Sequence, residues 1–102
     1  MFIFDFSVNR QIKLINKVLL STFTEEYTVS QNNFADVENL SYKIDYETGE
    51  VYCVELTIRY GRYYEDKEKE YLNFENICTL ELDLDATCDE LRVLFLDKLR
   101  HM

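Results

Sequence analysis

The sequence contains no proline, no tryptophan, only two glycines and only one histidine. Because proline is absent and no repeated or low-complexity segment occurs, nothing in the chain marks a linker. Gly49 and Gly61 alone cannot build a glycine-rich phosphate-binding loop, which disfavours nucleotide-dependent enzymes. A chain of 102 residues is also short for two domains. We therefore expect a single domain over residues 1–102.

Cysteines and long apolar segments are also scarce. Cys53, Cys78 and Cys88 are odd in number and form no CxxC pair, which predicts reduced thiols rather than a disulfide framework or a zinc site. The longest apolar runs have four residues, whereas a membrane-spanning helix needs roughly 20. The first residues also lack the basic and apolar pattern of a secretory signal. These absences predict a cytoplasmic protein, in the host-cell cytoplasm if the chain is viral.

Side chains suited to catalysis are few. His101 is the only histidine, and on a shared helix it would lie 13 residues, or about 20 Å, from Cys88, too far to act as its base. Asp83 to Thr87 is similar to the opening of a calcium loop. Cys88 and Leu94, however, stand where that loop has glycine and glutamate. We expect no enzyme activity, no metal site and no cofactor.

Acidic and apolar residues, by contrast, are plentiful. Hydrophobic residues make up 47% of the chain, which favours a folded core over disorder. Twenty acidic residues outnumber eleven basic ones, so the net charge is −9 and the pI is about 4.5. Residues 75–90 hold six acids and no base, and residues 24–58 have a net charge of −7. This charge repels nucleic acid and anionic membranes and favours a basic protein partner.

Two segments have the apolar spacing of amphipathic helices. The first runs over about residues 7–22, with Ser7 as its cap, and the second over about 88–101, opened by a Thr87–Glu90 capping box. Their apolar positions are three or four residues apart: Val8, Ile12, Ile15, Leu19 and Phe23 in the first, and Leu91, Leu94, Phe95 and Leu99 in the second.

Three segments between these helices alternate with a period of two, as half-buried strands do. They are residues 40–46, 52–60 and 78–84, and in each the even positions are apolar. We expect a three-residue turn, Glu47 to Gly49, that pairs Ile44 with Tyr52 and gives Gly49 a left-handed conformation.

The other segments are less regular. Residues 24–36 have no sustained period and are expected to form a loop, with at most a turn of helix. Residues 61–75 are predicted to be a charged connection that extends the hairpin at its tip. Residues 1–6 alternate briefly and are a candidate fourth strand.

These elements predict an α+β fold of two layers, in the order α-β-β-β-α. A sheet that is apolar on one face needs a cover. The N- and C-terminal helices are expected to supply it, on one face of an antiparallel three-stranded sheet.

Successive side chains of a strand point to opposite faces of the sheet, a rule we call strand parity. Because the even positions are apolar, strand parity directs most carboxylates to the face that the helices leave bare. Alternating acids place a charge every ~6.8 Å along a strand, whereas each DNA strand carries one per about 3.4 Å of axis. Acids on a neighbouring strand bring the density closer to that of DNA, although Lys43 and Arg59 interrupt it. The other interpretation is an ordinary solvated face, kept polar for solubility. The predicted partner-binding residues are Asp45, Glu47, Glu50, Glu55, Glu81, Asp83 and Asp85, with Tyr63 and Tyr64 as anchors.

The first functional hypothesis is a small acidic, non-enzymatic inhibitor. It would bind the basic nucleic-acid-binding surface of a nuclease or another nucleic-acid-binding protein, as a partial DNA mimic. In size, acidity and α/β layout the chain resembles phage-encoded anti-CRISPR proteins and the acidic immunity proteins of bacterial nucleases. This likeness of overall character implies an anti-defence or protective inhibitor.

The alternative hypothesis is a structural or assembly subunit. Val93 and Leu96 lie beside the apolar stripe of the second predicted helix. They are candidate contacts for a homodimer through that helix, and strand addition at a sheet edge is a second route to assembly.

Overall fold

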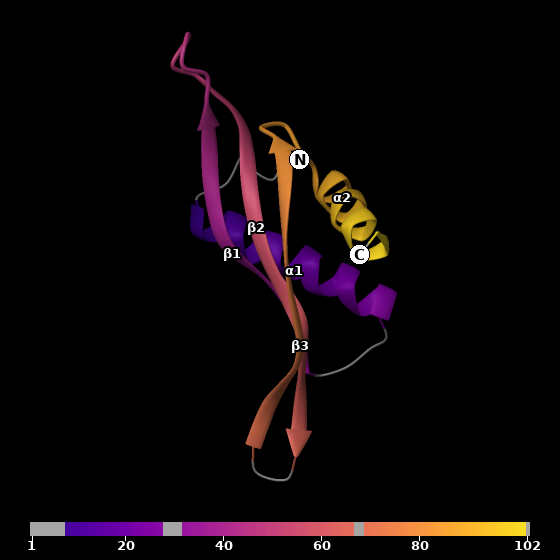
Figure 1. Cartoon of the computed structure of the whole chain (residues 1–102). Helices are drawn as coiled ribbons and strands as arrows, with labels where there is room; N and C mark the ends of the chain where they lie inside the picture. Colours follow the sequence, from indigo (N-terminus) through magenta and orange to yellow (C-terminus); the bar gives the residue numbers. More distant parts are fainter. Residues whose placement is uncertain (1–7, 28–31, 67–68, 102) are drawn as a thin grey trace.

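The computed structural model describes residues 8–27, 32–66 and 69–101 of the chain (Figure 1). Within them, two helices flank a three-stranded antiparallel sheet of strand order β1-β2-β3. The elements, in order, are α1 (Val8–Tyr27), β1 (Asn33–Ile44), β2 (Val51–Asp66), β3 (Lys69–Asp83) and α2 (Cys88–Arg100). This confirms the predicted α+β fold and its α-β-β-β-α order. The expected Ser7 cap and the candidate strand at residues 1–6 lie outside the described residues.

The core forms where both helices pack on one face of the sheet. The sheet contributes the even positions of β2 and β3, as strand parity predicts, and each helix contributes one apolar stripe. Thr87 caps α2, because its side-chain oxygen accepts a hydrogen bond from the Glu90 amide at 3.3 Å. The central core residues are Ile15, Leu19, Phe23, Val54, Leu56, Ile58, Tyr60, Leu80, Leu82, Leu91, Phe95 and Leu99.

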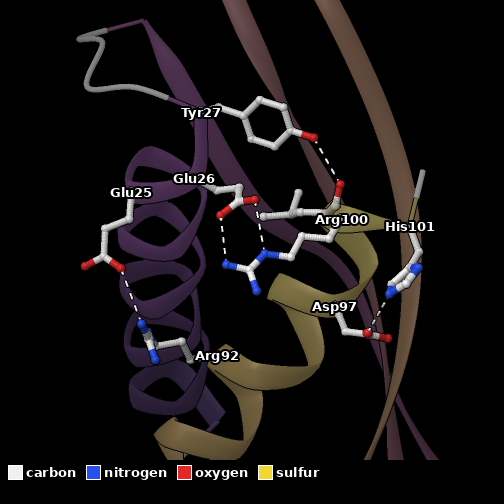
Figure 2. A network of polar contacts seen from close by, with 8 residues as sticks. Glu25, Glu26, Tyr27, Arg92, Asp97, Arg100 and His101 are labelled. Atoms are coloured by element: carbon white, nitrogen blue, oxygen red, sulfur yellow. Dashed lines mark hydrogen bonds and ion pairs between the residues drawn. The ribbon is translucent and has the colours of Figure 1, made fainter.

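The ends of α1 and α2 are joined by polar contacts (Figure 2). The Tyr27 hydroxyl donates a hydrogen bond of 3.1 Å to the Leu99 carbonyl, and Glu26 pairs with Arg100 at 3.2 Å. Exposed ion pairs stabilise little, so the buried apolar stripes carry most of the packing energy.

The expected loop at residues 24–36 is wrong at its C-terminal end, where β1 begins, whereas the turn of helix that the prediction allowed is present at its start. α1 continues to Tyr27, because Phe23 is fully buried and its ring packs 5.1 Å from that of Tyr27. Arg62 then donates a hydrogen bond of 3.0 Å to the Tyr27 carbonyl, which satisfies a free group at the helix end.

β1 begins at Asn33, not at residue 40. Ala35 and Val37 face the core at odd positions, and a bulge at Glu38 then moves the alternation to even positions. The bulge breaks the period of two, so the sequence pattern does not indicate the first half of the strand.

The first hairpin differs from expectation in its turn and in its pairing. Asp45 pairs with Glu50, so the first turn is the four residues 46–49, and Ile44 pairs with Val51 rather than with Tyr52. Tyr52 is an extra, bulged residue of β2. Gly49 has the predicted left-handed conformation, with φ of 73°.

The charged segment at residues 61–75 extends the second hairpin, as predicted, but its described residues do so as paired strand rather than as a connection. β2 extends to Asp66 and β3 starts at Lys69, and these two residues pair. The strands therefore extend well beyond the helices at both ends of the molecule (Figure 1), whose principal extents are 55 × 27 × 22 Å. At the end of the first hairpin, apolar residues of the core face remain exposed, namely Tyr42, Ile44, Tyr46 and Tyr52.

Candidate protein-binding surface

Two predicted partner-binding carboxylates on the bare face of the sheet share one lysine. Glu55 of β2 lies directly opposite Glu81 of β3. The Lys43 ammonium lies 3.2 Å from the Glu55 carboxylate and also donates a hydrogen bond to Glu81. These hydrogen bonds, the one to Glu81 foremost, raise the pKa of Lys43 above its ordinary value. The trio therefore keeps only one net negative charge.

The middle of the bare face is similarly neutralised. Arg59 donates two hydrogen bonds to Glu75, at 2.6 and 3.0 Å, in a bidentate pair that lowers the pKa of the Glu75 carboxyl. The Arg59 guanidinium also lies 4.7 Å from the centre of the Phe34 ring.

The predicted tyrosine anchors lie in this region and beyond it. Tyr63 is half-buried and packs 4.9 Å from the Phe34 ring. The side chain of Tyr64 lies outside the described residues.

The other predicted carboxylates gather where the first hairpin turns and β3 ends. Asp83 is the last residue of β3 and pairs with Cys53, which pairs in turn with Lys43 near the end of β1. This group, which we call the acidic end, consists of Asp45, Glu47, Glu50, Asp83 and Asp85. All five are exposed, and no ion pair of the described part of the chain includes any of them. The predicted anchors Tyr63 and Tyr64 are remote from it, since Tyr63 is about 33 Å along β2 from Cys53 at ~3.3 Å per residue.

Aromatic residues that the sequence assigned to the core accompany the acidic end. Tyr42, Tyr46 and Tyr52 are 43%, 101% and 57% exposed. With Lys43 and Ile44 they line a hollow of about 620 Å³, which we call the tyrosine hollow. No other aromatic ring in the described regions packs against these three rings.

The strands are longer than the helices that cover them, and this explains why these tyrosines are exposed, although the sequence pattern places the second strand only over residues 52–60. β2 has 16 residues, or about 53 Å of strand. α2 has 13 residues, or about 20 Å of helix. Helices of this size cannot cover the whole apolar face, so residues near the strand ends stay exposed.

The start of α2 offers a second apolar surface at the same end of the sheet. Asp89, Glu90, Val93 and Leu94 line a hollow of about 350 Å³. Val93, a predicted oligomer contact, is 59% exposed. Leu96, the other predicted contact, is half-buried on the same helix.

The three cysteines are free thiols in the structure. Cys53 faces the bare side of the sheet, as parity predicts, yet is only 6% exposed. Burial, followed by the nearby Glu81 carboxylate, raises the pKa of Cys53. Over residues 8–27, 32–66 and 69–101, no group of three or more His, Cys, Asp or Glu side chains is placed to hold a metal ion.

Comparisons with protein families, with characterised proteins and with solved structures find no match to this chain. Among the described residues, no helix combines the length and apolar character needed to span a membrane.

Proposed function

We propose that the chain is a non-enzymatic inhibitor that binds the basic surface of a protein partner through its acidic end. The partner surface of the right chemistry is the nucleic-acid-binding groove of a nuclease or of another nucleic-acid-binding protein. Unpaired carboxylates steer the encounter with such a surface, and exposed aromatic rings bury area once contact is made.

One observation carries this proposal: three exposed tyrosines and five acids that form no ion pair with a described residue occur together at one end of the sheet. Isolated exposed apolar residues are ordinary on a protein surface, but a group bordered by charge is typical of an interaction site. The bare face supports the proposal less, because Lys43 and Arg59 pair with three of its carboxylates.

The test is capture of a basic partner on the immobilised protein, from bacterial lysate, at low and at high salt. We expect a basic nucleic-acid-binding protein that is retained at low salt and released as screening increases. Added DNA should displace the inhibitor from this partner. Retention that is independent of salt, or a ternary complex with DNA, would contradict the proposal.

A second function has one observation in its favour. Val93 is the most exposed aliphatic side chain among the described residues, and it adjoins the hollow at the start of α2. Burial of this side chain between two copies would make the chain an assembly subunit. Light scattering across a concentration series separates the two functions, because a stable oligomer that Val93→Glu disrupts would favour assembly.

A further inference from the structure

The residues that line the tyrosine hollow are of a kind that binds cations. Tyr42, Tyr46 and Tyr52 contribute three of its five lining residues. These three residues are 43%, 101% and 57% exposed, so a ligand in the hollow can reach their rings. The face of an aromatic ring is the negative part of its quadrupole and attracts a cation within about 6 Å of the ring centre.

The charged residues around the hollow also favour a cation. Asp45 and Glu47 flank Tyr46 in the chain, and Glu50 closes the same turn. None of the three forms an ion pair with a described residue. A cation at this end of the sheet therefore meets carboxylates that no base neutralises.

Lys43 is the one basic residue in the lining, and its charge is already matched. Its ammonium contacts Glu55 and Glu81 on the bare face of the sheet. The carbon stem of Lys43 can line the hollow while the charged group is held by two carboxylates. The Lys43 side chain therefore does not repel a ligand cation strongly, because two carboxylates already neutralise its charge.

We propose that the tyrosine hollow binds the guanidinium of an arginine on the partner. This inference rests on the proposed function, since the arginine belongs to the basic surface that the acidic end recognises. A guanidinium suits the site better than an ammonium. It is planar and weakly hydrated, stacks on ring faces, and still donates N–H groups to nearby carboxylates and hydroxyls.

The test uses three acetylated and amidated peptides with one variable residue: Gly-Arg-Gly, the same peptide with citrulline, and the same with lysine. Citrulline has nearly the shape of arginine but no charge. Binding is followed by NMR titration of the full chain with labelled tyrosines. We expect the arginine peptide to shift the signals of Tyr42, Tyr46 and Tyr52. The citrulline peptide should bind at least about tenfold more weakly, and the lysine peptide should bind more weakly than arginine.

Two substitutions at Tyr52 distinguish the contribution of the aromatic ring face from that of side-chain size. Tyr52→Phe keeps the ring and should retain affinity within about threefold. Tyr52→Leu keeps apolar area but removes the quadrupole, and should weaken arginine binding by about 2- to 30-fold. Tyr63→Leu, at the far end of β2, is the matched control and should leave affinity unchanged. Equal binding of the citrulline peptide, or full affinity in Tyr52→Leu, would overturn the inference.

The outcomes also separate this inference from the proposed function. One outcome is that charge reversal at the acidic end abolishes partner capture while Tyr52→Leu leaves capture unaltered. In that case the proposed function stands and the proposed arginine site is wrong. If the arginine peptide binds the hollow and no basic partner is captured at low salt, the proposed arginine site is correct and the inhibitor proposal is wrong.

Discussion

Glu55 and Glu81 lie directly opposite each other on neighbouring strands, and the ammonium of Lys43 contacts both carboxylates. Like charges in this cross-strand position are destabilising unless a cation bridges them. Lys43 therefore acts as part of the sheet, and the two carboxylates are less available to a partner than those of the acidic end.

Replacement of the bridging lysine tests this arrangement. Lys43→Met should lower the free energy of unfolding at pH 7, because the facing carboxylates then repel each other. The raised pKa of Lys43 means that its stabilising effect is present below its ordinary pKa of 10.5 and is lost only as the pH rises through the higher folded-state value. Urea unfolding at pH 7 and above pH 10.5 measures the deficit, which should shrink in alkali as Lys43 loses its charge. A deficit that stays constant or grows there would contradict this account.

Glu75 predicts a second pH dependence of stability. Its hydrogen bonds from Arg59 lower its pKa below the ordinary value of 4.5. Its contribution is therefore present above pH 4.5 and is lost as the pH falls through the lower folded-state value. We expect Glu75→Gln to melt a few degrees below the wild type at pH 7 and to approach it near pH 3. Thermal unfolding followed by circular dichroism gives both values. A gap that stays constant with pH would show that the ion pair contributes nothing.

The two glycines should differ in what can replace them. A Cβ at Gly61 would lie 2.1 Å from the carbonyl oxygen of Phe74, so the backbone itself must move. We expect Gly61→Ala to cost about 1–3 kcal/mol.

Gly49 instead has open space and a φ of +73°. Gly49→Ala should cost about 1–2 kcal/mol from the left-handed backbone, and Gly49→Asn should recover most of that loss. Denaturant midpoints of the three variants test this ranking. Equal tolerance of alanine and asparagine at position 49 would argue against the turn.

Buried and exposed aromatics should separate stability from binding. Phe23 is fully buried, with its ring 5.5 Å from Tyr60 and 6.2 Å from Phe74. Phe23→Ala should destabilise the fold by about 3–5 kcal/mol. Tyr46, which is fully exposed, should tolerate Tyr46→Ser within about 0.5 kcal/mol. Calorimetry compares the two, and a large loss of stability at Tyr46 would mean that its ring serves the fold rather than a partner.

The regular parts of the fold were predictable because periodicity reports a buried face. Period two located the cores of β2 and β3 and directed Glu55, Glu81 and Asp83 away from the helices. The period carries no information on bulges. The extra residue at Glu38 concealed the first half of β1, and the bulge at Tyr52 altered the pairing of the first hairpin.

The candidate site was predictable only in part. Strand parity together with the position of acids at the strand ends predicts the acids of the first turn and of the β3 end. The tyrosines beside them had the parity of core residues, and their exposure depends on where the helices cross the sheet. That position is set by tertiary contacts such as the hydrogen bond from the Val37 amide to Asn16, at 2.8 Å, which no local pattern encodes.

The most direct test of the central claim is quantitative partner capture with two charge-reversed variants. The acidic-end variant carries Glu47→Lys, Glu50→Lys and Asp85→Lys, and the control carries the same change in charge through Asp36→Lys, Glu38→Lys and Asp97→Lys. All six positions are exposed. We predict that the control retains the basic partner at low salt and that the acidic-end variant retains none. Equal capture by the two variants would show that total charge, and not the acidic end, recognises the partner.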